Sequence, residues 1–182
     1  MRKIVAAFFI SLDGVVESPD KWHFPYFDDE MGAAIGAQMS ESDAMMMGRV
    51  MYQDWAAYWP DKTEADDQFA PFINNIQKYV VSSTLDKVEW QNCTLISGDF
   101  VEEITKLKQE PGKTISISGS TTLVRSLMRH GLLDELRLLV HPIVVGTGQR
   151  LFEDGVQIPM KLTSSATFET GVLSLVYQPA EK

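Results

Sequence analysis

The chain has 182 residues and a mass of 20.4 kDa, which is the length of one ordinary domain. Apolar residues make up 45 % and charged residues 23 % of the sequence, a composition that excludes an intrinsically disordered chain. The 16 Lys and Arg residues against 25 Asp and Glu give a net charge of −9. Because a negatively charged protein repels a phosphate backbone, we do not expect it to bind nucleic acid.

Sites for disulfides, metals and membranes are also not expected. The single cysteine, Cys93, has no partner for an internal disulfide, which favours a cytoplasmic protein. His23, His130 and His141 lie far apart and lack the spacing of metal ligands, so no metal site is expected. No apolar run reaches the about 18 residues that a transmembrane helix needs, so we expect no membrane span.

Strand and helix signals alternate along the whole chain. Residues 4–10 form an unbroken apolar run, which is typical of a central strand covered on both faces. Further strands are expected at 44–47, 79–81, 94–97, 114–118 and 136–145, the last of them interrupted at His141-Pro142, and a closing hairpin at 162–167 and 172–177. Helices with one apolar face are expected at 29–39, 49–55 and 69–76, from Asp99 to Pro111, and from Ser120 to the Gly131 stop.

Helices between strands indicate an α/β fold with a mostly parallel sheet and an antiparallel edge at the C-terminus. Since no repeat or linker interrupts the pattern, we expect one domain spanning residues 1–182.

Three of the expected strands end in the same way, with small or hydroxyl residues that usually lead into a helix. Ligands of α/β sheets bind at the carboxyl ends of the strands, and the N-terminus of a helix offers free N–H groups to a phosphate. These ends predict a site for a nucleotide with more than one phosphate; the alternative is that the glycines are structural and the serine is a simple N-cap. The segments are Met47-Gly48-Arg49, Val81-Ser82-Ser83-Thr84 and Ser118-Gly119-Ser120-Thr121-Thr122.

Asp13 follows the first strand and is expected at the same edge of the sheet. A carboxylate beside aromatic residues suits a small planar substrate, although Asp13-Gly14 is alternatively a plain turn. The nearby aromatic residues are Trp22, His23 and Phe24. A second aromatic group, either a substrate wall or a subunit contact, consists of Trp55, Tyr58 and Trp59.

Several short motifs follow one another along the chain in an order that is characteristic of one family. They are Ser11-Leu12-Asp13-Gly14, Met47-Gly48-Arg49-Val50-Met51-Tyr52, Val80-Val81-Ser82-Ser83-Thr84-Leu85, Ser118-Gly119-Ser120, Gly131-Leu132-Leu133-Asp134-Glu135-Leu136-Arg137, and the stretch from His141 to Gly148. Over residues 2–178 the chain resembles the C-terminal reductase domain of the bifunctional riboflavin-biosynthesis deaminase-reductase, within the dihydrofolate-reductase-like superfamily.

The resemblance implies a three-layer αβα fold with a mixed sheet, NADPH as cofactor and a homodimer. It further implies that Asp13 faces the nicotinamide and the substrate, as the candidate catalytic residue. By the same resemblance the adenosine-side phosphates lie near Gly48 and Arg49, the 2′-phosphate near Ser82 and Ser83, and the pyrophosphate on Gly119, Ser120, Thr121 and Thr122. The substrate pocket is expected beside Trp22, Gly146 and Gly148.

The expected function is an NADPH-dependent reductase that transfers hydride to a small heterocyclic, carbonyl or imine substrate. The alternative is a non-catalytic dinucleotide- or pterin-binding module with a regulatory or scaffold role. The deaminase signature H-x-E with P-C-x-x-C is absent from the sequence, so a role in riboflavin synthesis does not follow from the resemblance.

Overall fold

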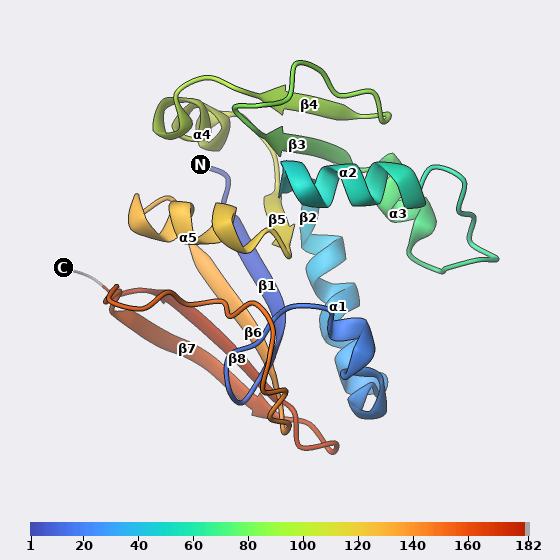
Figure 1. Ribbon diagram of the computed structural model, residues 1–182, viewed down its shortest axis with the longest axis vertical. Coiled ribbons are helices and arrows are strands. Elements are labelled where there is room, and N and C mark those ends of the chain that lie inside the picture. The colour runs from blue at the N-terminus through green and yellow to red at the C-terminus, as the bar shows by residue number, and fades with distance from the viewer. Residues whose placement is uncertain (181–182) are drawn as a thin grey trace.

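The computed structural model describes residues 1–180 and has an eight-stranded sheet at its centre, in the order β4-β3-β2-β5-β1-β6-β8-β7 (Figure 1). The parallel strands are β1 (Ile4–Ser11), β2 (Ser42–Gly48), β3 (Gln77–Val81), β4 (Cys93–Ile96), β5 (Thr114–Ser118) and β6 (Glu135–His141). The hairpin of β7 (Met160–Thr167) and β8 (Leu173–Pro179) joins β6 in antiparallel pairing. The expected mostly parallel sheet with a C-terminal hairpin is therefore confirmed.

Helices cover both faces of this sheet, which confirms the three-layer αβα arrangement (Figure 1). One face carries α1 (Asp29–Glu41), α2 (Arg49–Tyr58) and α3 (Ala70–Asn75), and the other carries α4 (Phe100–Gln109) and α5 (Thr121–Arg129). Two 3₁₀ turns, at Pro19–Lys21 and Phe24–Tyr26, precede α1. None of the helices within residues 1–180 is long and apolar enough to cross a membrane.

The central strand β1 shows why its sequence is apolar at every position. Side chains alternate between the faces of a strand, and β1 has a helical layer on each side. Ile4 and Phe8 pack in the cluster that includes α4 and α5, whereas Phe9 packs in the cluster that includes Met31 of α1. Both sets of alternating positions are therefore covered.

The interruption expected at His141-Pro142 is confirmed, because β6 ends at His141, but the strand does not resume over residues 143–145 as predicted. Pro142 has no N–H to continue the pairing. The backbone turns instead toward the loop after β1, where the Leu12 amide donates to the Ile143 carbonyl at 2.8 Å. This correction matters for the site, because it brings residues 142–150 to the carboxyl edge of the sheet.

Candidate functional site

The junction of β5 and α5 is built around two residues with left-handed backbone. Gly119 has φ +75° and Ser120 has φ +52°. A Cβ atom at Gly119 would lie 3.3 Å from the Met51 sulfur, so a glycine fits here with both backbone and packing. The Ser120 hydroxyl oxygen accepts a hydrogen bond from the Gly48 amide at 3.0 Å. Two of the predicted strand ends are thus in direct contact.

Ser120 occupies the N-cap position of α5, but its hydroxyl does not cap the helix, because it binds Gly48. The helices α5 and α2 both begin at this junction, and the first N–H groups of a helix have no intrahelical acceptor. Thr121 is buried and Thr122 is exposed in the first turn of α5. Arg49, at the start of α2, is exposed and donates to the Gln53 side chain at 2.9 Å. The arrangement offers amides, hydroxyls and one cation to an anionic ligand.

The third strand end lies beside this junction, because Val81 of β3 is paired with Gly48 of β2. The Ser82 hydroxyl is buried and accepts from the Thr84 amide at 3.2 Å and the Leu85 amide at 3.1 Å. Ser82 therefore stabilises the turn that follows β3, while the neighbouring Ser83 is exposed.

Asp13 links the loop after β1 to the loop after β6. Its Oδ1 accepts from the Ser11 hydroxyl at 2.6 Å and from the Val145 amide at 3.1 Å, and its Oδ2 accepts from the Gly146 amide at 2.8 Å. The Arg150 side chain donates to the Asp13 carbonyl at 2.9 Å. The carboxylate is thus an acceptor for both loops.

These contacts lower the pKa of Asp13 from its usual value of 3.8 to about 2, through the Ser11 hydroxyl first and then the amides of Val145 and Gly146. Each of these donors stabilises the ionised form. Asp13 is therefore a carboxylate at neutral pH, which favours a positioning role over proton donation. Its assignment as the catalytic residue stays a prediction.

The predicted pocket residues Gly148 and Trp22 pack close to the Asp13 loop. A Cβ atom at Gly148 would lie 2.9 Å from Val15, so the two loops touch there. Trp22 is buried, donates to the Glu17 carbonyl at 3.1 Å, and meets the His141 ring edge-on at 5.2 Å between centroids. Neither these two residues nor Gly146 lines the cavity of about 470 Å³ between the sheet and helices α1, α2 and α3. Their place in a substrate pocket stays a prediction.

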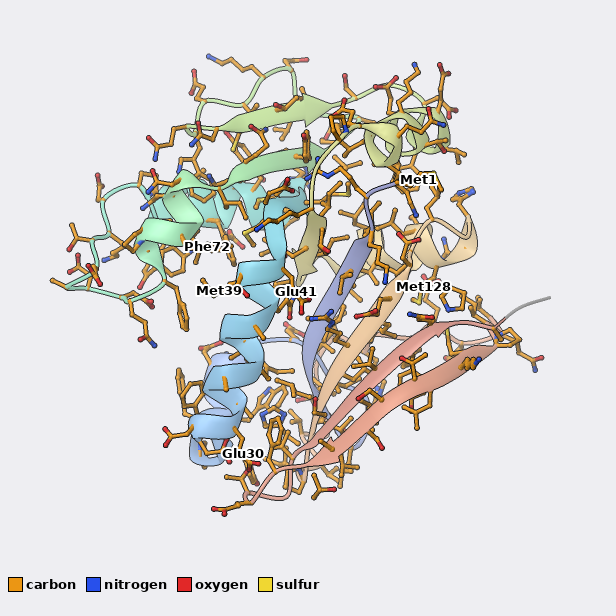
Figure 2. All side chains as sticks on the ribbon, turned by 180° about the vertical axis from the view of Figure 1, so that it is seen from behind. Met1, Glu30, Met39, Glu41, Phe72 and Met128 are labelled. Carbon is orange, nitrogen blue, oxygen red and sulfur yellow. The ribbon has the colours of Figure 1, made fainter. Side chains whose placement is uncertain are left out.

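A cavity of about 470 Å³ lies between the sheet and helices α1, α2 and α3, a volume typical of small-molecule sites. Ala7 and Phe9 of β1 and Ser118 of β5 form part of its wall. In Figure 2 the labelled Phe72 of α3 and Met39 of α1 lie on this side of the sheet, and both line the cavity. The cavity meets the junction of β5 and α5 at Ser118, the residue that precedes Gly119.

The sequence left Trp55 and Trp59 as either a substrate wall or a subunit contact, and both line this cavity. Tyr58 is 53 % exposed and is not part of the wall. Residues that sequence reasoning did not select include Phe27, Phe72 and Arg137. The density of aromatic residues at 22–27 and 55–72 is a signal that could have found Phe27 and Phe72, whereas no local signal marks Arg137.

His23 is the imidazole in the cavity wall. Its ring is stacked on Phe9 at 4.5 Å between centroids and tilted against Phe24 at 4.3 Å. Burial and the neighbouring His141 lower the pKa of His23, so the ring is neutral at neutral pH. Within residues 1–180, its buried Nδ1 has no hydrogen-bond partner. A buried polar atom without a partner is uncommon in folded proteins.

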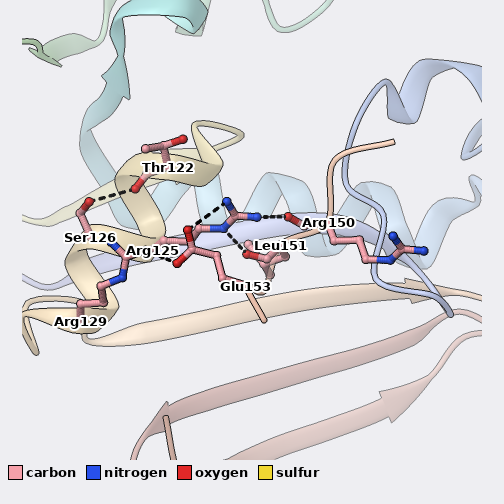
Figure 3. Close-up of polar contacts among 7 residues, drawn as sticks. All are labelled: Thr122, Arg125, Ser126, Arg129, Arg150, Leu151 and Glu153. Carbon is pink, nitrogen blue, oxygen red and sulfur yellow. Dashed lines mark hydrogen bonds and ion pairs between the residues drawn. The ribbon is translucent and has the colours of Figure 1, made fainter. Parts of the chain in front are cut away.

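A second cavity of about 380 Å³ lies on the opposite face, beside α5 and the hairpin. Arg125 of α5 borders it and donates to the Leu151 carbonyl at 2.9 Å and to the Arg150 carbonyl, as Figure 3 shows. Glu153 pairs with Arg125 at 3.4 Å and also with Arg129. These contacts fasten α5 to the segment that follows the Asp13-binding loop.

Among residues 1–180, no group of three or more His, Cys, Asp and Glu side chains has the arrangement to hold a metal ion.

Comparison with known proteins identifies relatives of the whole chain. The RibD C-terminal domain family matches residues 2–174. YyaP, a Bacillus subtilis (strain 168) protein of uncharacterised function, is 32 % identical over 180 residues, which are 97 % of this chain and 94 % of that protein.

Solved structures show the same fold. A Shewanella sp. PV-4 protein named for riboflavin biosynthesis superposes with a TM-score of 0.80 at 18 % identity, covering 98 % of this chain and 99 % of that one. Dihydrofolate reductase from Enterococcus faecalis, in complex with NADP(H), gives a TM-score of 0.66 at 13 % identity, covering 98 % and 97 % of the two chains. The fold is therefore that of dihydrofolate reductase, and the chain belongs to the RibD C-terminal domain family.

Proposed function

We propose that the protein is an NADPH-dependent reductase that transfers hydride to a small heterocyclic, carbonyl or imine substrate. Its family and the fold of its neighbours support a reductase-type function. The observation that carries the proposal is the continuity of two sites on β5. Ser118 lines the large cavity, and the next residue, Gly119, begins the junction of β5 and α5 that would bind the phosphates. A dinucleotide on the junction would have its reactive end next to a cavity of substrate size.

The residues at the junction fit the phosphates of NADPH. Gly119, Ser120, Thr121 and Thr122 would hold the pyrophosphate with backbone amides and hydroxyls at the N-terminus of α5. Gly48 and Arg49 would bind the phosphate on the adenosine side, with the guanidinium of Arg49 as the cation. Ser82 orders the turn after β3, from which the exposed Ser83 would donate to the 2′-phosphate.

When bound, NADPH supplies the hydride. The chain orients the acceptor and excludes water from it, which are the roles of the aromatic wall formed by Trp55, Trp59 and Phe72. Asp13 holds the loops after β1 and β6 together through the Val145 and Gly146 amides and so fixes the edge on which the nicotinamide would rest. Asp13 is a positioning residue in this proposal.

The test is titration of the purified protein with NADPH and with NADH, followed by nicotinamide fluorescence. We expect saturable NADPH binding, much weaker NADH binding, and oxidation of NADPH when quinones, pterins and pyrimidines are added in turn. If neither NADPH nor NADH binds, the reductase proposal is removed.

The alternative is a non-catalytic module that binds a dinucleotide or a pterin in a regulatory or scaffold role. This alternative keeps the phosphate-binding residues and needs no role for Asp13 beyond holding the loops after β1 and β6 together through the Val145 and Gly146 amides. NADPH binding without turnover of any acceptor would support this alternative. A homodimer and a cytoplasmic location complete the proposal.

A further inference from the structure

We propose that the large cavity accepts an uncharged, planar aromatic molecule and rejects a phosphorylated one; as an account of the hydride acceptor, this inference rests on the proposed reductase function.

Aromatic rings make up much of the wall. Phe24 and Phe27 come from the segment before α1, Trp55 and Trp59 from α2, and Phe72 from α3. The rings of Trp55 and Trp59 meet edge-on, with centroids 5.8 Å apart. Rings in such a wall bind a flat aromatic molecule by stacking and edge contacts, and burial of its apolar surface adds to affinity.

The wall has no free cation for a phosphate. Among the described residues that line the cavity, Arg137 is the one Lys or Arg. Its guanidinium is already paired with Glu135 at 2.6 Å and with Glu41 at 2.8 Å. A phosphate ester is normally bound by unpaired Arg or Lys side chains or by free amides. To bind one here, Arg137 would have to leave its two carboxylates.

The remaining charge in the wall repels an anion. Asp67, between α2 and α3, is the one carboxylate of the lining, and the chain as a whole has a net charge of −9. Moving a phosphate from water into an apolar space beside a carboxylate is unfavourable in both desolvation and Coulomb energy. The wall therefore selects against anionic substituents that enter the cavity.

His23 adds a ring to the wall without adding charge. Its ring stacks on Phe9, and burial together with His141 lowers its pKa, so the imidazole is neutral at neutral pH. It offers no charge to an anion and a further surface to a flat aromatic molecule. An aromatic ketone, a quinone or an uncharged nitrogen heterocycle fits a wall of this kind.

The test compares two probes that share one ring system, 2-naphthol and 2-naphthyl phosphate, by isothermal titration calorimetry without cofactor. We expect 2-naphthol to bind at least about tenfold more tightly, a difference of about 1.4 kcal/mol. Tighter or equal binding of the phosphate ester, or binding of neither probe, would overturn the inference.

Two variants assign the binding to this cavity. Phe72→Ala removes one ring of the wall and should weaken 2-naphthol binding at least threefold, whereas the matched change Phe152→Ala, in the other cavity, should leave it unchanged. Asp67→Asn keeps a side-chain oxygen for the Phe69 amide but removes the charge, so it should strengthen binding of the phosphate ester alone. Equal effects of Phe72→Ala and Phe152→Ala would also contradict the inference.

The same preparations are titrated with NADPH, which separates this inference from the proposed function. Binding of 2-naphthol without NADPH binding would remove the reductase proposal and leave the cavity specificity intact. NADPH binding together with preference for the phosphate ester would do the reverse.

Discussion

At the scale of single residues, Asp13 and His23 occupy different parts of the site, although the sequence places both near the substrate. Asp13 accepts hydrogen bonds from Ser11, Val145 and Gly146, so its oxygens are committed to the protein. His23 lies in the cavity wall with an unpartnered nitrogen among the described residues. Asp13, which links the loops after β1 and β6, is thus distinct from His23, which lies in the cavity wall.

Asp13→Asn should alter how stability depends on pH. The folded pKa of Asp13, about 2, lies below its usual value of 3.8. Above about pH 4 the ionised carboxylate therefore stabilises the folded protein, and this contribution is lost as the pH falls from 4 toward 2. We expect urea midpoints of the wild type to fall more steeply over that interval than those of Asp13→Asn. Parallel curves for the two proteins would show that the Asp13 contacts do not stabilise the fold.

At the scale of elements, the start of α5 combines two features of the site. Gly119 and Ser120 take left-handed backbone, and the helix that follows begins against Gly48. At its other end α5 stops at Arg129, and Gly131, which follows the C-cap residue His130, has φ +66° and open space around its Cβ position. The two glycines therefore share backbone geometry but differ in surroundings.

Gly119→Ala and Gly131→Ala form a matched pair. Each should lower the free energy of unfolding by about 1–2 kcal/mol, the cost of left-handed backbone for a residue with a Cβ atom. Gly119→Ala alone should also weaken NADPH binding, by about tenfold, because its Cβ displaces Met51 at the junction. Chemical denaturation and fluorescence titration measure the two effects. Unchanged NADPH affinity in Gly119→Ala would contradict the phosphate assignment.

Arg125 connects α5 to the segment after β6, and its loss should destabilise the protein. Its side chain is 17 % exposed and donates to the Leu151 carbonyl. Arg125→Ala should therefore lower the free energy of unfolding by about 2 kcal/mol, since charged donors to buried acceptors are lost. Arg129 is 47 % exposed and pairs with Glu153 at the surface, so Arg129→Ala should cost less than about 1 kcal/mol. Urea denaturation of both variants gives the comparison, and equal losses would contradict this account.

At the scale of the whole molecule, one edge of the sheet lies outside the helical layers. The helices cover β1 to β6, whereas the C-terminal hairpin extends beyond them (Figure 1). Leu162 of β7 is 47 % exposed and Leu173 of β8 is 38 % exposed. Apolar side chains on an uncovered sheet face are typical of a surface between subunits.

The proposed homodimer is tested by changing this hairpin. Sedimentation equilibrium of the wild type should give twice the 20.4 kDa chain mass, and Leu162→Asp should give a single chain mass. Ser164 is paired with Val176 and faces the other side of the hairpin, so Ser164→Asp is the control that should remain dimeric. A monomeric wild type would remove the dimer, and a dimeric Leu162→Asp would exclude this surface.

The sequence by itself determined the order and type of the elements, because these depend on local patterns. The apolar run at β1, the Asp99 cap that accepts from the Glu102 amide at 2.9 Å, and the Gly131 stop of α5 were all readable from neighbours in the chain. The same local signals predicted that Gly48 and Ser120 lie at strand ends. The break at His141-Pro142 was readable in the same way, but the failure of the strand to resume was not, because the Ile143 carbonyl pairs with the Leu12 amide, which is far away in sequence.

Only the tertiary structure decided what the site is made of. The large cavity joins Phe9, His23, Trp55, Phe72 and Arg137, which come from separate elements and meet only when the helices pack on the sheet. The pairing of Arg137 with Glu41 and Glu135, and the saturation of Asp13 by distant amides, depend on the same packing. Local sequence patterns report each strand and helix, whereas charge balance and free polar atoms in a cavity are properties of the contacts between them.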